Sequence, residues 1–371
     1  EYDKVTGAVD NLYGKMYNAI ANVNNILDHI HADNGVLLTP GMYEIIRGEC
    51  LALRAFLHFD LMRLFGPVPA DLEAGGARLP YVRVVSKEIK LPVSYDEYKD
   101  FLLKDLRDAA ALLKEYDPIV VEGSVTDEFL VRRTCRMNYY AVKALQARAF
   151  LWYGEKENAY AAAMEVIEAK NSDGSKKFDI EAIKTAFPGQ DFIIYPEQIF
   201  GLYDHQLDDK YSSFFQTGIL YKGTSSQEIM KNLYGNTGKD FREQYLWELQ
   251  RLVDGDRYTI KKYNVTLGVK QIPLIRLSEL YFIAIESGSA EQAQKLWDEY
   301  RDSRVLDRKD LPTDPKQLQQ EILKEFRKEF YAEGQLFYLY KRYNSPREDI
   351  LFANSRLVVN YILPLPKTEL K

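Results

Sequence analysis

The segment that most restricts how this chain can fold is "GECLALRAFLHFDLMRLFGPVP", residues 48–69. It is apolar on almost every side of a helical wheel, and it ends at Gly66-Pro67 because proline cannot continue a helix. A helix that is hydrophobic all round is buried, so other elements have to cover this one. Its charged residues Arg54, Asp60 and Arg63 then need partners, because a buried charge without one is costly.

Amphipathic helices flank this segment on both sides. Over 9–30, apolar residues recur at helical spacing, and we expect these to share one inward face: Leu12, Met16, Ile20, Val23, Ile26, Leu27 and Ile30. Over 94–116, Ser94 and Glu97 form a capping-box pattern before a second apolar face. Strand-like pieces such as 81–86 and 198–203 are few, so the predicted fold is mostly α-helical.

Two helix pairs resemble each other in sequence. Over 144–170, Gly154 ends one helix and Ala159 follows five residues later; over 277–301, Gly288 and Ala293 repeat this spacing. The glycine ends a helix and the small alanine lets the returning helix pack closely. The pattern is typical of tetratricopeptide-like hairpins, while ordinary antiparallel helices remain the alternative from these residues alone.

Composition excludes several classes of protein. The 371 residues are 46% hydrophobic and 28% charged, which is enough for a large core in one or two domains. A net charge of −6 and the lack of a run of Lys and Arg argue against nucleic-acid binding. No stretch reaches the roughly 18 apolar residues of a membrane span. Because the sequence starts at Glu1 without Met, we expect a mature or trimmed chain, so that any targeting segment would lie outside it.

The search for catalytic and metal-binding motifs finds none. Cys50 and Cys135 are interpreted as small buried hydrophobes rather than a disulfide pair. The four histidines lack metal-ligand spacing, and no nucleotide-binding or nucleophile motif occurs. The acid pair Asp105 and Asp108 is interpreted as part of a solvated helix face rather than a glycosidase dyad. We therefore predict no catalytic residue, no metal and no cofactor.

The stretch from about 190 to 263 differs from the rest of the chain. It has weak periodicity and is predicted to be rich in loops, and long loops inside a compact domain are often functional. Fourteen aromatic residues lie in it, and the whole chain has 27 Tyr against 18 Phe. The flat face of Tyr suits the C–H surface of a sugar ring and its hydroxyl can bond sugar hydroxyls, although a role in the core remains the alternative for each ring.

Several motifs occur in the order found in one known family. The segment 48–69 resembles the pattern GEA-x-x-LRA-x-x-[YF]-[FY]-DL-x-R-[LY]-[FY]-GPVP of the SusD/RagB outer-membrane lipoproteins of Bacteroidetes. "LYGKMYNAIANVNNIL", "SYDEYKDFLLKDLRDAAALL", "QIPLIRLSELYFIAIES", "EFRKEFYAEGQLFYLYKR" and "YILPLPKTEL" resemble further family segments. The chain departs from the family where Leu336 replaces an arginine and Leu339-Tyr340 replaces Asp-Leu, while the frame of Glu325, Glu329, Glu333, Gly334, Lys341 and Arg342 remains.

The resemblance implies a fold and a division of the chain. It implies a mostly α-helical alpha-alpha superhelix of tetratricopeptide-like hairpins with an irregular, loop-rich region packed on one side. We expect a single SusD-like domain over 1–371, with the helical scaffold at 1–170 and 265–371 and a candidate ligand-binding region at 171–264. The segment 48–69 would lie between neighbouring hairpins.

The resemblance also implies a function. Such proteins capture glycans or similar nutrients at the cell surface, where an N-terminal lipid anchor outside this chain holds them to the outer membrane, and pass them uncleaved to a SusC-like TonB-dependent transporter. We predict ligand-stacking roles for Trp247, Tyr245, Tyr258, Tyr234 and Tyr13, the last because the family often places an aromatic residue before that helix core. An adaptor that binds only protein and, less favoured, an all-helical carbohydrate-active enzyme are the alternatives.

Overall fold

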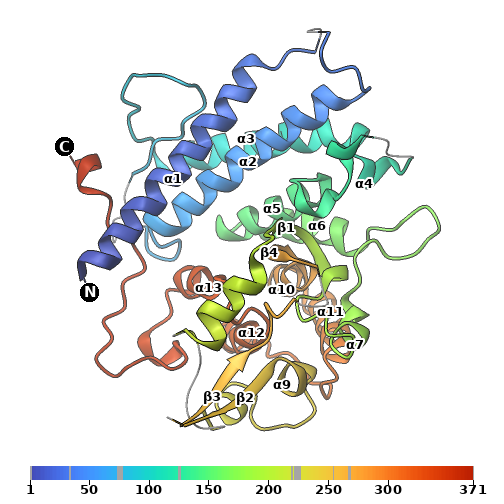
Figure 1. The fold of residues 1–371 in the computed structure, drawn as a ribbon, viewed down its shortest axis with the longest axis vertical. Helices are drawn as coiled ribbons and strands as arrows, with labels where there is room; N and C mark the ends of the chain where they lie inside the picture. Colours follow the sequence, from blue (N-terminus) through green and yellow to red (C-terminus); the bar gives the residue numbers. More distant parts are fainter. Residues whose placement is uncertain are drawn as a thin grey trace. The chain divides into compact units, whose positions relative to one another are not determined.

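The structure is a computed structural model, which describes residues 2–32, 35–72, 78–123, 127–218, 220, 227–253, 255–265 and 269–370. Its contacts divide the chain into two compact units. Unit 1 contains Glu1–Arg133, Met137–Gly154 and Phe337–Lys371, and unit 2 contains Thr134–Arg136 and Glu155–Leu336. Figure 1 shows that helices dominate, as the sequence predicts. The expectation of a single domain over the whole chain, with boundaries near 170 and 265, stays a prediction.

Unit 1 is built on long helices. They are α1 (Tyr2–His29), α2 (Met42–Phe65), α3 (Tyr95–Tyr116), the short α4 (Pro118–Val121), α5 (Tyr139–Trp152) and α13 (Leu336–Tyr343). The apolar segment forms most of α2, which packs against α1 and α3 and ends at Gly66 as predicted. Arg54 of α2 binds Asp105 of α3 through two nitrogens, and Arg63 pairs with Asp60, so the buried arginines have the partners they need.

The inward face of α1 differs from the predicted one. Met16, Ile20 and Val23 are buried as expected, but Leu12 and Ile26 are 42% and 43% exposed. The face contains Asn24, which is fully buried, donates to the carbonyl of Val82 and accepts a hydrogen bond from Arg54. Hydrophobic periodicity assigns the inward face of a helix from its apolar residues alone. It could not place the polar Asn24 on that face, so the predicted face is rotated away from the observed one.

Among the described residues, unit 2 contains the remaining α-helices and the four strands. They are α6 (Lys156–Ile167), α7 (Ile183–Ala186), β1 (Gln198–Tyr203), α8 (Leu207–Tyr211), α9 (Phe241–Tyr245), β2 (Trp247–Leu252), β3 (Gly255–Ile260), β4 (Gln271–Arg276), α10 (Leu277–Ser287), α11 (Ala290–Ser303) and α12 (Pro315–Glu329). β1 pairs with β4 and β2 with β3, both antiparallel. The strand predicted at 198–203 is β1, whereas 81–86 forms no strand.

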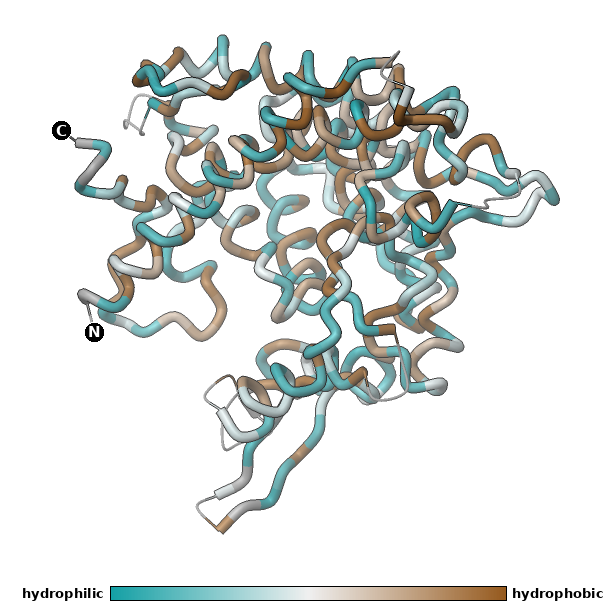
Figure 2. Tube along the Cα trace, turned by 45° about the horizontal axis from the view of Figure 1, so that its top comes forward, coloured by the Kyte–Doolittle hydropathy of each residue, from teal (hydrophilic) through white to brown (hydrophobic). Residues whose placement is uncertain are grey.

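The hairpin of α10 and α11 has the predicted construction. Gly288 ends α10, Ser289 caps α11 with Gln292 in a capping box, and Ala293 is buried. A Cβ on Gly288 would lie 2.9 Å from the Tyr160 ring of α6, so the glycine allows α6 to approach α10. Brown apolar and teal polar positions alternate along the helices in Figure 2, as expected for helices with one covered face.

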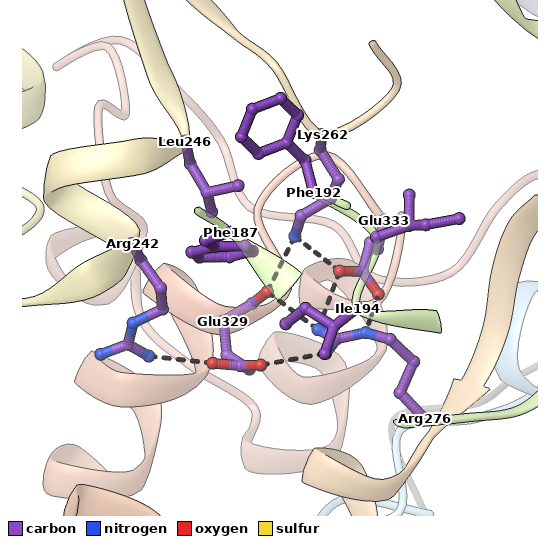
Figure 3. Close-up of a pocket in the computed structure, with 10 residues that line it drawn as sticks. Phe187, Phe192, Ile194, Arg242, Leu246, Lys262, Arg276, Glu329 and Glu333 are labelled. Carbon is purple, nitrogen blue, oxygen red and sulfur yellow. Dashed lines mark hydrogen bonds and ion pairs between the residues drawn. The ribbon is translucent and has the colours of Figure 1, made fainter. Parts of the chain in front are cut away.

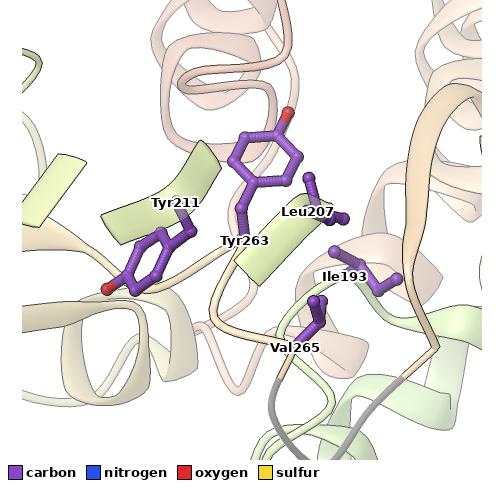
Figure 4. Close-up of a cluster of buried hydrophobic side chains, with 5 residues drawn as sticks. All are labelled: Ile193, Leu207, Tyr211, Tyr263 and Val265. Carbon is purple, nitrogen blue, oxygen red and sulfur yellow. The ribbon is translucent and has the colours of Figure 1, made fainter. Parts of the chain in front are cut away.

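The predicted loop-rich region consists of short elements. Within the described parts of 171–264 the α-helices α7, α8 and α9 have four or five residues each. A cluster of buried apolar side chains joins α8 to neighbouring loops (Figure 4): Ile193, Leu207, Tyr211, Tyr263 and Val265. The Tyr263 hydroxyl donates to the Ala332 carbonyl at 2.9 Å, which ties this cluster to the chain after α12. Among the described helices of both units, none is long and apolar enough to cross a membrane.

Candidate functional site

A cluster of buried charges lies at the C-terminal end of α12 in unit 2 (Figure 3). Glu329, the last residue of α12, accepts hydrogen bonds from Arg242 at 3.1 Å, from Arg276 at 3.0 Å and from Arg304 at 2.7 Å. Glu197 joins Arg276 at 3.2 Å and Arg304 at 2.8 Å. These side chains come from α9, β4, the end of α11 and the turn before β1, so the cluster connects segments that are distant in sequence.

The cluster holds the start of the segment that carries most of the predicted site. We call this segment, residues 240–253 and 255–262, the α9–hairpin segment; it contains α9, β2 and β3. Asp240 caps α9 and accepts from Arg242 Nη2 at 2.7 Å. The same guanidinium donates to Glu325 at 2.7 Å and to Glu329. Arg242 Nη1 also donates to the Tyr300 hydroxyl of α11 at 2.6 Å, so the donors of this guanidinium end on buried acceptors of Asp240, α11 and α12.

The end of the segment is held by a second cation. Lys262, two residues after β3, donates to the Glu329 carbonyl at 2.9 Å, the Tyr331 carbonyl at 3.1 Å and the Glu333 carboxylate at 2.6 Å. Arg276 at the end of β4 also donates to Glu333 at 2.9 Å. Both ends of the α9–hairpin segment are thus joined to the same turn of chain at and after Glu329.

The pKa shifts follow from burial and from these pairs. Burial alone would raise the pKa of Glu329, but Arg304, Arg276 and Arg242 together hold it well below its ordinary value. Burial raises the pKa of Glu197 despite its two arginines, and lowers the pKa of Lys262 despite Glu333. Glu329 is therefore an ionised anchor at any physiological pH.

The cavity beside this cluster is too small to hold a ligand. Its volume is about 10 Å³, and its walls include Phe187, Phe192 and Leu246 as well as the charged groups. A space of this size holds at most about one water molecule. We therefore assign the cluster the role of positioning the α9–hairpin segment, and look for a ligand surface on the segment itself.

Two of the predicted aromatic residues are buried at the base of the hairpin. Trp247 and Tyr234 are 8% and 2% exposed. Trp247 Nε1 donates to the Tyr234 hydroxyl at 3.0 Å, and the Trp247 ring packs edge-on against Tyr331 with ring centroids 5.0 Å apart. In this conformation protein covers both rings, which leaves them little face to offer a sugar.

Tyr245 and Tyr258 are the two predicted residues with ring surface to offer. Both are half-buried. Tyr245 ends α9 and packs edge-on against Phe241 at 5.5 Å, while Tyr258 of β3 pairs across the hairpin with Leu249 of β2. Part of each tyrosine is therefore exposed to solvent, while the Tyr245 ring also packs against Phe187 with ring centroids 6.2 Å apart.

Tyr13 belongs to α1 of unit 1. It is 4% exposed, packs edge-on against Phe65 at 5.1 Å, and donates to Glu369 at 3.4 Å. Burial, with the negative charge of Glu369, raises the pKa of its hydroxyl to about 12. The structure surrounds Tyr13 with the core of its own helical unit.

A wide cleft that the sequence did not indicate lies between α6, α10 and α11 of unit 2. Its volume is about 700 Å³. Typical ligand sites have volumes of about 300–1,000 Å³, so this cleft is large enough for a ligand. Tyr160, Met164 and Leu296 give it apolar walls, and Lys295 and Glu299 give it polar ones. None of the five predicted aromatic residues lines it. Its lining comes from three helices and from the segment after α6, which single-helix periodicity cannot reveal.

One interpretation of acidic residues was wrong. Asp105 is buried, accepting from Arg54 and from the Tyr81 hydroxyl at 2.7 Å, rather than lying on a solvated face. Asp108 is exposed and pairs with Lys104. The described residues contain no group of three or more His, Cys, Asp and Glu side chains arranged to hold a metal. Cys50 and Cys135 form no disulfide, as predicted; Cys50 is buried as expected, whereas Cys135 is half-buried and donates to Gln271 Oε1 at 3.2 Å.

The chain is similar to known proteins both in sequence and in structure. Residues 139–368 match the profile described as "SusD family", and residues 1–122 match one described as "Starch-binding associating with outer membrane". No curated protein matches the chain. Similar solved structures include a SusD superfamily protein from Bacteroides thetaiotaomicron VPI-5482, with 22% identity over 89% of this chain and 74% of that one and a TM-score of 0.69.

Two further solved structures carry ligand descriptions. A laminarin binding SusD-like protein has 18% identity over 98% of this chain and 84% of that one, with a TM-score of 0.67. A SusD-like carbohydrate binding protein from Bacteroides vulgatus ATCC 8482 has 18% identity over 90% and 69%, with a TM-score of 0.58. At such identities the likeness establishes the fold, which is mostly α-helical with tetratricopeptide-like hairpins.

Proposed function

The chain belongs to the SusD family, and on that premise we propose that it captures a glycan at the cell surface and passes it, uncleaved, to a TonB-dependent outer-membrane transporter. The proposal places the protein at the outer membrane, held by a lipid anchor. Two similarities support this proposal. Residues 1–122 match a family described as starch-binding and associating with the outer membrane, and one structural neighbour is a laminarin binding SusD-like protein.

The observation that carries this proposal is the fixed aromatic segment. The α9–hairpin segment presents Tyr245 and Tyr258 while buried ion pairs hold its two ends. Aromatic platforms bind best when their positions are fixed before the ligand arrives, because less conformational entropy is then lost on binding. We assign the stacking contacts to Tyr245 and Tyr258, and to Trp247 and Tyr234 the support of the hairpin that carries them. For Tyr13 we propose only support of α1.

Isothermal titration with purified polysaccharides tests the site. We expect Tyr245→Ala and Tyr258→Ala each to weaken glycan binding by about 1–3 kcal/mol, the scale of an aromatic stacking contact. Tyr203→Ala is the matched control, because Tyr203 is an exposed tyrosine on β1, outside the segment. Unchanged affinity in both variants would remove the stacking role from this segment. Trp247→Ala should weaken binding only together with a loss of thermal stability.

A pull-down from outer-membrane extracts tests the transporter. We expect the tagged chain to retain a TonB-dependent transporter whose gene adjoins its own. If the transporter is retained while a glycan array stays blank, the adaptor that binds only protein becomes the better proposal. Release of reducing ends from a polysaccharide incubated with the chain would instead establish an enzyme.

A further inference from the structure

A cleft on unit 1 between α2 and α3 has an unusual balance of charge. It has a volume of about 430 Å³ and an apolar wall that includes Leu51 and Leu112. Six ionisable side chains line it: Arg47, Arg54, Arg83, Lys104, Asp105 and Asp108. No local sequence pattern indicates this cleft, because its lining comes from two helices and from the segment before α3.

The pairing of these charges leaves two cations over. Asp105 forms an ion pair with Arg54, whose Nη2 lies 2.6 Å from one carboxylate oxygen, and Asp108 forms an ion pair with Lys104. No carboxylate among the described residues forms an ion pair with Arg47 or Arg83. The cleft therefore carries two uncompensated positive charges on a chain whose net charge is −6.

Arg83 is held in a defined position without belonging to a strand or helix. Its carbonyl accepts from Arg54 Nη1 at 3.1 Å, and the neighbouring Val82 donates its N–H to His58 Nε2 at 3.1 Å. Its guanidinium lies over the Phe101 ring, 4.0 Å from the centroid. A guanidinium stacked in this way keeps its N–H donors at its edges, where they can bind a carboxylate or sulfate in the plane.

We propose that the α2–α3 cleft binds the anionic substituent of an acidic glycan, with Arg47 and Arg83 donating to a carboxylate or sulfate group. The sugar ring then lies against the apolar wall of Leu51 and Leu112. The volume suits a small ligand rather than a folded partner. This inference rests on the proposed glycan-binding function and narrows it to acidic glycans, while using residues outside the α9–hairpin segment.

Titration calorimetry with four probes tests the proposal: a galacturonic acid trisaccharide, a sulfated oligosaccharide, maltotriose as the neutral sugar and hexaglutamate as an acidic peptide. We expect at least one acidic sugar to bind, more weakly as salt is added because salt screens exposed charges. Arg47→Gln and Arg83→Gln together should weaken that binding at least tenfold. Arg107→Gln is the matched control, because Arg107 is exposed on α3 outside the cleft, and it should leave the affinity unchanged.

The outcomes separate this inference from the proposed function. The acidic sugar that binds identifies whether carboxylate or sulfate is recognised. If neutral glycans bind and neither acidic sugar does, the inference fails while glycan capture stands. If Arg107→Gln weakens binding of the acidic sugar as much as the cleft variants do, the loss comes from the overall charge of the protein and the cleft has no specific role. If hexaglutamate binds more tightly than either acidic sugar, the cleft binds a protein partner instead. If no glycan of any kind binds, the proposed function fails.

Discussion

Replacing Glu329 by Gln should destabilise unit 2 more than any single change on its surface. The carboxylate of Glu329 receives Arg242, Arg276 and Arg304, and the Tyr300 hydroxyl at 3.1 Å. Glutamine keeps the shape but removes the negative charge, and its amide places donors against guanidinium donors. Breaking a buried ion pair from one side costs about 3–5 kcal/mol, because the remaining charge stays buried.

The remaining partners limit the loss to that range. Without Glu329, Arg242 keeps Asp240, Arg276 keeps Glu333 and Arg304 keeps Glu197, so no arginine is left without a carboxylate. For a domain the size of unit 2, a loss of about 3–5 kcal/mol lowers the unfolding midpoint by about 6–20 °C.

Differential scanning calorimetry measures this directly. The matched control is Glu181→Gln, which makes the same chemical change in an exposed pair with Lys184 of unit 2. We expect the control to cost less than about 1 kcal/mol, as exposed pairs do. If Glu329→Gln changes the midpoint no more than the control, the cluster contributes little to the fold and its positioning role is wrong.

Three further predictions concern two buried titratable groups and the glycine that ends α10. Burial lowers the pKa of His58 to about 3, below its unfolded value. The contribution of this group to stability is therefore complete above about pH 6.5 and is lost as pH falls towards 3. In urea denaturation, the free energy of unfolding of the unchanged chain should be about 2–3 kcal/mol lower at pH 4.5 than at pH 6.5, and His58→Gln should lack this loss. Burial likewise lowers the pKa of Lys341, which donates to the Gly66 carbonyl at 2.7 Å, to about 7. Stability from this group is complete above about pH 10.5 and falls as pH drops to 7, so the denaturation midpoint of the unchanged chain should rise from pH 7 to 10 more than that of Lys341→Met; equal slopes would contradict this. Gly288→Ala should cost about 1–3 kcal/mol in thermal denaturation, because its Cβ would meet Tyr160 at 2.9 Å, whereas Gly14→Ala, with nothing within 4 Å, should not destabilise.

The helices were predictable because their signals are local. The apolar run of α2, its end at Gly66-Pro67 and the capping box of α3 all act within a few residues, and the structure has each of them. The partner of Arg54 was not predictable, since Asp105 lies 51 residues away and follows the same i,i+3 spacing as an ordinary exposed charge. For the same reason the polar centre of α1, Asn24, was missed.

The candidate site shows the same division between local and distant signals. The family resemblance singled out Glu325, Glu329 and Glu333, which supply three carboxylates of the buried cluster, while Glu197 and Asp240 supply two more. Their basic partners Arg242, Arg276 and Arg304 come from three other elements, and no spacing in the sequence links them. Trp247 is a residue type that often stacks on sugars, but only its contacts with Tyr234 and Tyr331 in the structure reveal that its ring is covered.

The structure separates two ways of losing glycan binding. If buried charges fix the α9–hairpin segment and Tyr258 supplies contact area, Tyr258→Ala should lose affinity with an unchanged unfolding midpoint, because a half-buried ring contributes little to the core. Glu329→Gln should lose affinity and stability together, because it removes one of the two α12 carboxylates that hold Arg242 and so weakens the attachment of the start of the segment. Crystals of Glu329→Gln with the segment unmoved and glycan affinity intact would show that the aromatic surface does not depend on the charges beneath it.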